Sequence, residues 1–138
     1  MKLKIICDNN NQLICFNKML KKELLKKQIN KVCRVKFVAK DCNKFDICLI
    51  ISNELEFVYK NSYEYTKEKI SKSKVVILTS NLRSANIIGC LNITPYVYYI
   101  KTNINSIISK IIKIYEKNTN NLYCKVPEKK IAKRNLTV

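Results

Sequence analysis

The sequence predicts an α/β protein in which helices cover both faces of a five-stranded parallel sheet. Three short apolar runs carry this prediction, at Leu3–Cys7, Ile47–Ile51 and Val75–Leu78. None of them alternates with polar residues, a pattern typical of strands that are buried on both faces. Segments with helical periodicity separate the runs, and such an alternation of strand and helix favours a parallel sheet. We expect Asp46–Ile51 to be the central strand.

Four elements are predicted before the central strand. In chain order they are a strand over Lys2–Cys7, a helix over about Asn11–Gln28, an edge strand over Lys31–Lys40 and a turn or very short helix over Asp41–Lys44. The helix is expected because apolar residues recur three or four positions apart, at Leu13, Phe16, Leu20 and Leu24. The edge strand alternates, and its odd-numbered residues are expected to face the core.

Five further elements are predicted after the central strand. They are a helix over Glu54–Ile70, a strand over Lys74–Thr79, a short helix over Leu82–Cys90, a strand over Tyr96–Ile100 and an amphipathic last helix over about Asn103–Asn118. Residues 1–118 therefore form one domain. Residues 119–138 are a basic tail with a linker-like, asparagine-rich start. The tail is either disordered or the beginning of a truncated DNA-binding output region.

The composition excludes several kinds of active site. The chain has no histidine, one glycine and seven cysteines without a CxxC pair. It therefore lacks a Ser-His or Cys-His pair, a glycine-rich phosphate loop and the spacing of a zinc site. We expect no metal, no cofactor and no enzymatic activity. The apolar runs are too short for a membrane span or a signal-peptide core, so a cytoplasmic protein is expected.

The chain has a formal net charge of +17, and lysine supplies 24 of its 27 cationic residues. Such a charge suggests an anionic partner such as nucleic acid. The lysines are spread along the chain, however, and lysine, isoleucine and asparagine are the residues that an AT-rich genome encodes by default. A solvated lysine surface is therefore the simpler interpretation.

In parallel α/β folds the functional site lies at the carboxyl ends of the strands. Asp8 and Asn9 follow the first strand, and Ile51 ends the central strand. Thr79 ends the fourth strand, and Lys101 follows the fifth. We expect these five residues to lie near one another.

Four segments together resemble the receiver domain of bacterial response regulators, and most closely the receivers of LytTR-type regulators. The segments are Ile5-Ile6-Cys7-Asp8-Asn9-Asn10, Phe45-Asp46-Ile47-Cys48-Leu49-Ile50-Ile51, Ile77-Leu78-Thr79-Ser80 and Tyr98-Tyr99-Ile100-Lys101-Thr102. Their spacing fits as well, with 43 residues from Asp8 to Ile51, 28 from there to Thr79 and 22 more to Lys101. The resemblance covers about residues 2–117 and implies a (βα)5 flavodoxin-like, CheY-like fold.

The resemblance also implies a chemistry from which this chain departs. In working receivers two acidic residues after the first strand and an aspartate that ends the third hold Mg²⁺, and that aspartate accepts a phosphoryl group. Here Ile51 stands in place of the acceptor and Asn9 in place of the second acidic residue. Asp46 lies at the other end of the strand, about 17 Å from Ile51 at ~3.3 Å per residue, too far to replace the acceptor. We expect Lys101 to pair with Asp8 instead.

The resemblance implies a pseudo-receiver, a regulatory module that works without phosphorylation. It would act through protein contacts made by the segments Leu82–Cys90, Tyr96–Ile100 and Asn103–Asn118, either with a partner or in a homodimer. One of Tyr98 and Tyr99 would be the switch aromatic, and Tyr99 is favoured. The expected interface consists of Tyr99, Ile104, Ile108, Ile111 and Tyr115.

Two alternatives are kept. A truncated transcription regulator would bind DNA through its basic surface and through the tail residues Lys125, Lys129, Lys130, Lys133 and Arg134. The other alternative is a small phosphotransferase on a flavodoxin-like sheet. The absence of histidine and of a glycine-rich loop argues against it.

Overall fold

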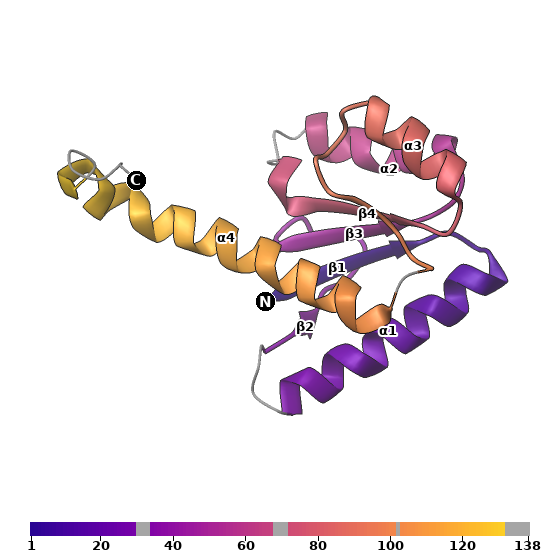
Figure 1. Cartoon of the computed structure of the whole chain (residues 1–138), viewed down its shortest axis with the longest axis horizontal. Coiled ribbons are helices and arrows are strands. Elements are labelled where there is room, and N and C mark those ends of the chain that lie inside the picture. Colours follow the sequence, from indigo (N-terminus) through magenta and orange to yellow (C-terminus); the bar gives the residue numbers. More distant parts are fainter. Residues whose placement is uncertain (30–33, 68–71, 102, 132–138) are drawn as a thin grey trace.

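The computed structural model describes residues 1–29, 34–67, 72–101 and 103–131. Five parallel strands form one sheet in the order β2-β1-β3-β4-β5, with helices on both of its faces (Figure 1). The predicted α/β class and the parallel five-stranded sheet are confirmed. The strand order 2-1-3-4-5 is that of a flavodoxin-like fold.

The strands are short, and β3 lies at the centre of the sheet. They are β1 (Lys2–Cys7), β2 (Lys36–Phe37), β3 (Ile47–Ile51), β4 (Val75–Thr79) and β5 (Val97–Tyr99). All five residues of β3 are fully buried. It pairs with β1 from Leu3–Ile47 to Cys7–Ile51, and with β4 from Cys48–Val75 to Ile51–Leu78. The apolar run therefore became the strand that is covered on both faces and paired on both edges.

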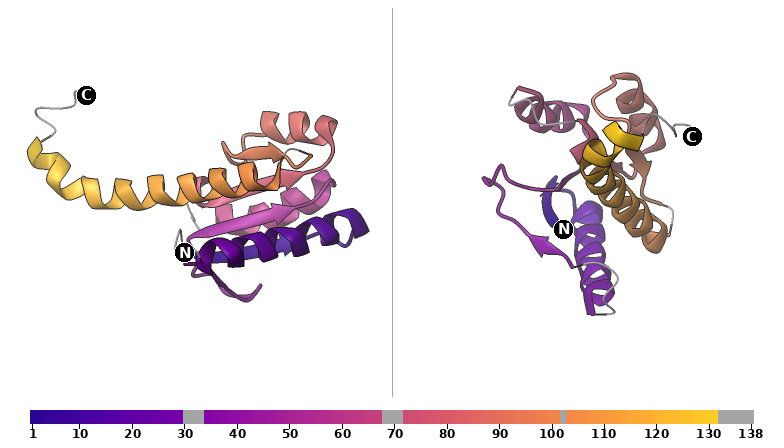
Figure 2. Two further views of the ribbon diagram at one scale, coloured as in Figure 1. Left: turned by 60° about the horizontal axis from the view of Figure 1, so that its bottom comes forward. Right: turned by 90° about the vertical axis from the view of Figure 1, so that its left-hand side faces the viewer.

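Four α-helices cover the sheet in the described part of the chain. They are α1 (Asn11–Ile29), α2 (Leu55–Lys67), α3 (Leu82–Cys90) and α4 (Ile104–Ile131), and a short 3₁₀ helix, η1 (Lys72–Lys74), precedes β4. Figures 1 and 2 show α1 and α4 on one face of the sheet and α2 and α3 on the other. No helix within the described ranges is long and apolar enough to cross a membrane.

The strands send alternate side chains into two separate apolar cores. Ile47, Leu49 and Ile51 of β3 pack in the core beneath α1 and α4. Cys48 and Ile50 point the other way, into the smaller core beneath α2 and α3. Because neither side of β3 meets water, the strand needs no polar residue, and its unbroken apolar sequence follows from this position.

Asparagine and serine side chains begin the helices at the carboxyl edge of the sheet. The Asn10 Oδ1 accepts from the Gln12 N–H (2.9 Å) at α1, and the Asn103 Oδ1 accepts from the Asn105 N–H (2.8 Å) at α4. At α3 the N-cap is Asn81, whose Oδ1 accepts from the Ser84 N–H (3.0 Å). These bonds satisfy N–H groups that a helix leaves unpaired, and they hold the loops of this edge close to the strands.

The second strand is shorter than predicted. The alternation predicted a strand over Lys31–Lys40, of which residues 31–33 lie outside the described part, and β2 spans only Lys36–Phe37. It pairs with β1 through Lys2 and Leu3 alone. Val35 is buried and Phe37 half-buried, as the odd-numbered face requires, whereas Ala39 is exposed.

The connection from β2 to β3 forms no helix, although a very short one was considered over Asp41–Lys44. Lys4 of β1 holds this connection in place. Its side chain is 2% exposed, its Nζ donates to the Cys42 carbonyl (2.9 Å), and its ammonium lies 5.5 Å from the centroid of the Phe45 ring. Burying an ammonium is costly unless it is hydrogen-bonded. Lys4 therefore ties this connection to the sheet.

The last helix is longer than predicted. The sequence predicted its end at about Asn118, followed by a linker, and α4 instead runs to Ile131 and extends well beyond the sheet (Figure 2). Pro127 lies within it. Three residues of the predicted nucleic-acid set belong to this helix, namely Lys125, Lys129 and Lys130. The structure does not describe their side chains. Lys133 and Arg134 lie outside the described residues.

Candidate functional site at the carboxyl edge of the sheet

The backbone brings the ends of β1, β3 and β4 together at one edge. The Asp8 N–H donates to the Ile51 carbonyl (2.8 Å), and the Ser52 N–H donates to the Leu78 carbonyl (3.1 Å). These bonds continue the sheet by one residue beyond the strands. Asp8, Ser52 and Thr79 therefore lie on adjacent strand ends, at the place where the sequence predicted a site.

Ile51 occupies the position at which the resemblance would place a phosphorylated aspartate. Its side chain is fully buried and belongs to the core beneath α1 and α4. Burying an isoleucine there stabilises the fold by about 1.5–3 kcal/mol. A side chain without oxygen in an apolar core can neither accept a phosphoryl group nor ligate a metal ion.

Asp8 is half-buried and bonded to its neighbours through both carboxylate oxygens. Its Oδ2 accepts from the Ser52 hydroxyl (2.8 Å), and its Oδ1 accepts from the Asn9 N–H (2.7 Å). Ser52 is fully buried, and its Oγ also accepts from the Glu54 N–H (2.9 Å) just before α2. The Asp8–Ser52 pair therefore joins β1 to the start of α2.

The predicted ion pair between Asp8 and Lys101 is wrong. In the part of the chain that the structure describes, the salt bridge joins Lys26 and Glu23 (3.3 Å) instead. Lys101 is exposed. The physical reason is that a buried hydroxyl and a backbone N–H already satisfy the carboxylate. The hydrated ammonium would gain little from an additional contact.

Asn53 is the centre of a second group of hydrogen bonds. Its Oδ1 accepts from the Thr79 hydroxyl (2.8 Å) and from the Ser80 N–H (2.8 Å), and its Nδ2 donates to the Ser80 Oγ (2.8 Å). The Ser84 hydroxyl of α3 donates to the Asn53 carbonyl (3.0 Å). One amide side chain and its own backbone thus connect the end of β3 to the end of β4 and to α3.

The hydroxyl group of Thr79 already donates its proton to a hydrogen bond within the protein. Its side chain is fully buried, it donates to Asn53, and its Oγ1 accepts from the Asn81 N–H (3.2 Å). The resemblance would have this hydroxyl donate to a phosphoryl oxygen. In this structure it donates to the amide oxygen of Asn53.

Ser52, Asn53 and Ser84 were not among the five residues that the sequence analysis singled out at this edge. Ser52 and Asn53 follow the buried strand directly, and that position was the only available signal. The side-chain bond of Ser84 to the Asn53 carbonyl depends on how α3 packs against the end of β3. Spacing along the chain does not contain that information.

The described residues offer no obvious place for a metal ion. No three cysteine, aspartate or glutamate side chains come together among them, and Asn9 is exposed. Cys7 next to Asp8 is half-buried, and its thiol donates to the Asp8 carbonyl (3.3 Å). Burial, and then the negative charge of Asp8, raise the pKa of the Cys7 thiol. It therefore stays protonated at neutral pH, which makes it a poor nucleophile.

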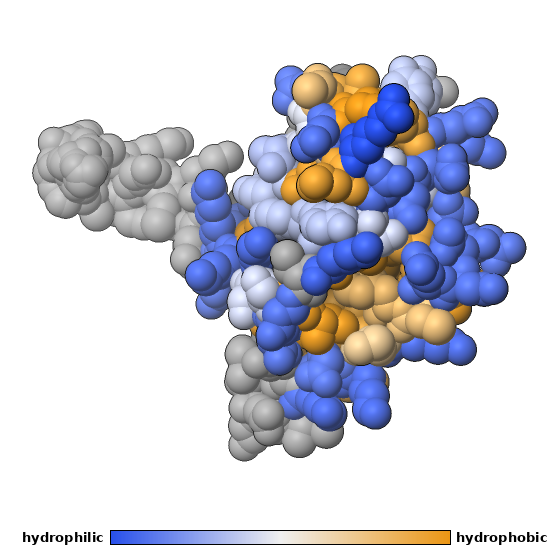
Figure 3. All heavy atoms as spheres, turned by 45° about the vertical axis from the view of Figure 1, so that its right-hand side comes forward, coloured by the Kyte–Doolittle hydropathy of each residue, from blue (hydrophilic) through white to orange (hydrophobic). Residues whose placement is uncertain are grey.

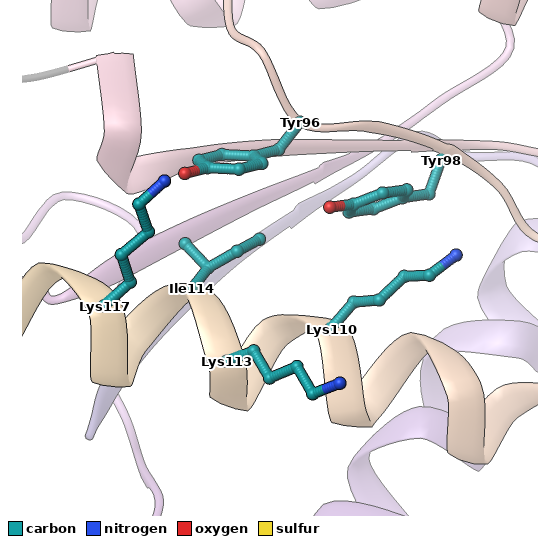
Figure 4. A pocket seen from close by; sticks show the side chains of 6 residues that line it. All are labelled: Tyr96, Tyr98, Lys110, Lys113, Ile114 and Lys117. Atoms are coloured by element: carbon teal, nitrogen blue, oxygen red, sulfur yellow. The ribbon is translucent and has the colours of Figure 1, made fainter. Parts of the chain in front are cut away.

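A second candidate region is a hollow of about 220 Å³ between β5 and α4 (Figure 4). Six side chains line it: Tyr96, Tyr98, Lys110, Lys113, Ile114 and Lys117. The Lys110 ammonium lies 4.7 Å from the centroid of the Tyr98 ring. Burial, and then Tyr96, raise the pKa of Tyr98, so its phenol remains a hydrogen-bond donor. The three lysines and the absence of an acidic side chain among these six make the hollow suitable for an anionic group.

The predicted interface residues are largely part of the protein's own core. Ile108 and Ile111 of α4 are fully buried in the core between this helix and the sheet, so they are not available to a partner. Ile104 and Tyr115 are half-buried against the same core. Tyr99 is half-buried and pairs in register with Thr79, and its role as a switch stays a prediction. Between β5 and α4, the tyrosines and lysines that line the hollow are at least partly exposed.

No protein-family model, no curated protein and no solved structure matches this chain. The class of the protein is therefore defined by the fold and by the two regions described above.

We predict that replacing Asn53 by alanine destabilises the fold by about 1–3 kcal/mol. The substitution leaves the buried Thr79 hydroxyl and the Ser80 N–H without their acceptor. Urea unfolding followed by circular dichroism measures the change. Asn43→Ala is the matched control, because Asn43 is exposed in a loop. Equal stability of the two variants would contradict the role given to Asn53.

We also predict that Ile51→Asp does not create a working acceptor. It places an uncompensated carboxylate in the apolar core, at a cost of about 3–5 kcal/mol. The control Ile51→Val should cost only about 0.5–1.5 kcal/mol. Urea unfolding of both variants provides the comparison. If the aspartate variant were as stable as the valine variant, the side chain at position 51 would have access to water or to a cation.

Proposed function

We propose that this protein is a regulatory module that resembles a response regulator receiver and works without phosphorylation. The observation that carries the proposal is the closed carboxyl edge. Ile51 fills the core where an acceptor would stand, and Asn53 and Ser52 take up the hydrogen bonds of Thr79 and Asp8. These hydrogen bonds hold three strands and two helices together and leave no side chain at position 51 that could accept a phosphoryl group, which supports the proposal.

A module without chemistry of its own must act through contacts, and the hollow between β5 and α4 supports one surface for them. It combines two half-buried tyrosines with three lysines. Tyrosine is enriched in the energetically important parts of protein interfaces. The lysines favour a partner that presents carboxylates, and the net charge of +17 would steer such a partner toward the protein. The proposed partner surface is therefore β5 with the first half of α4.

The proposal predicts that acetyl phosphate and Mg²⁺ leave the protein unmodified. Intact-mass spectrometry of the full chain checks this, with a phosphorylatable receiver treated in parallel as the control for the reagent. The expected spectrum shows the unmodified mass alone. A phosphoryl adduct on any residue at the carboxyl edge would contradict the proposal.

The second candidate is nucleic-acid binding, and the charges of the helices favour it. Among the side chains that the structure describes, α1 carries four lysines and one glutamate, and α4 carries three lysines and one glutamate, on one face of the sheet. On the other face, the described side chains of α2 include one lysine and one glutamate, and α3 has a single arginine. A face of this kind can bind phosphates without reading base sequence.

If this candidate is right, a short DNA duplex binds the protein, and the affinity falls steeply between about 50 and about 200 mM salt. Fluorescence anisotropy measures the affinity at each salt concentration. Lys113→Ala should lower the slope of log affinity against log salt by about 0.9, which corresponds to one lost phosphate contact. Lys60→Ala on α2 is the control on the opposite face and should leave the slope unchanged. Undetectable binding at the lowest salt concentration would eliminate the candidate.

A further inference from the structure

The face formed by α2 and α3 exposes more apolar surface than a face turned only toward water needs. Three of its side chains form a stripe on α2 that recurs every four residues. The exposed apolar and aromatic side chains are Leu55 (36%), Tyr59 (58%), Tyr63 (54%), Leu82 (58%), Ile87 (38%) and Leu91 (51%). We call these six residues the α2–α3 patch. Figure 3 shows apolar atoms at the surface in the upper part of the molecule, where α3 lies.

Helix α3 exposes apolar side chains in addition to the one that it buries. It buries Ile88, exposes Leu82 and Ile87, and carries Arg83 as its single charged residue. Exposed apolar residues that gather in one patch are typical of a surface that a partner covers. The sheet covers one side of α3, and part of the remainder is open in the single chain.

The two helices also carry opposite charges without internal partners. Glu56 of α2 and Arg83 of α3 are both exposed, and neither forms an ion pair within the described residues. A twofold interface brings each of two such residues close to the other in the second copy. Glu56 and Arg83 therefore supply one exposed charge of each sign, on the two helices that carry the patch, for a self-complementary contact to pair.

We propose that the α2–α3 patch binds a second copy of this chain and forms a twofold dimer. The second copy is the occupant that the charge distribution favours. Two copies with a net charge of +17 repel each other wherever lysines meet, and the lysines of the helices are concentrated on α1 and α4. The α2–α3 face is the one on which like-charged copies can approach. Depletion of charge at the centre is also typical of interfaces.

This dimer is independent of the proposed function, because it leaves the hollow between β5 and α4 free. The two α1–α4 faces would point outward from the dimer, each with its own set of lysines. A partner of either candidate function would then meet two equivalent surfaces. If the dimer does not form, the proposal for the hollow is unaffected.

Sedimentation equilibrium of the full chain over a range of concentrations tests the dimer. The expected result is a reversible species of twice the 16.2 kDa mass of the chain. Leu82→Glu should raise the dissociation constant at least tenfold, because it buries a carboxylate at the contact. Since Leu82 is 58% exposed in the monomer, circular dichroism should show an unchanged fold.

Met19→Glu is the matched control, because Met19 is 57% exposed on α1, outside the patch. It should leave the dissociation constant unchanged. A monomer at every concentration would overturn the proposal, and so would an equal effect of Met19→Glu. A dimer that responds to Lys113→Glu and not to Leu82→Glu would place the contact at the hollow and would also overturn it.

Exchanging the two charges tests the geometry of the contact. Glu56→Arg and Arg83→Glu should each weaken the dimer several-fold, since each places like charges opposite one another. The double variant should restore most of the affinity, because the pair is then reversed. Failure of the double variant to recover would overturn the assigned pairing of Glu56 with Arg83.

Discussion

The structure depends on the burial of β3. Its five apolar residues are fully removed from water, and it pairs with β1 over all five residues and with β4 from Cys48 to Ile51. At about 1.5–3 kcal/mol for each large apolar side chain, this one strand is a major source of stability. It also fixes the register of β1 and β4, because a slip of one residue would exchange the side chains that face the two cores. The positions of the residues after these strands follow from that register.

The carboxyl edge of the sheet is held together by polar side chains that bond one another. Polar groups at the ends of buried strands must find partners, since an unsatisfied buried donor or acceptor costs about 1–3 kcal/mol. In this protein Asn53 and Ser52 satisfy them from within. The same bonds position the starts of α2 and α3. These bonds consequently join the ends of β1, β3 and β4 to the starts of α2 and α3.

The two faces of the sheet differ in charge, and this difference separates two kinds of contact. The face of α1 and α4 carries most of the lysines of the helices and the hollow with Tyr96 and Tyr98. The face of α2 and α3 is nearly neutral and exposes apolar side chains. Electrostatic steering acts over the first face, whereas close apolar packing is possible at the second. An anionic partner and a second copy of the chain would therefore not compete for one surface.

The sequence by itself determined the parallel α/β fold and the burial of Ile51, because an unbroken apolar run is the sequence pattern of a strand that is buried on both faces. It also placed Asp8 and Thr79 at the same edge of the sheet, because the carboxyl ends of parallel strands all lie at one edge. Only the tertiary structure decided which groups these residues bond. The exposed Lys101 does not reach Asp8, whereas Ser52 and Asn53 lie within hydrogen-bonding distance of their partners. Periodicity records whether a side chain is buried, but a hydrogen bond depends on positions within a few tenths of an ångström, and those are set by the packing of elements distant in sequence.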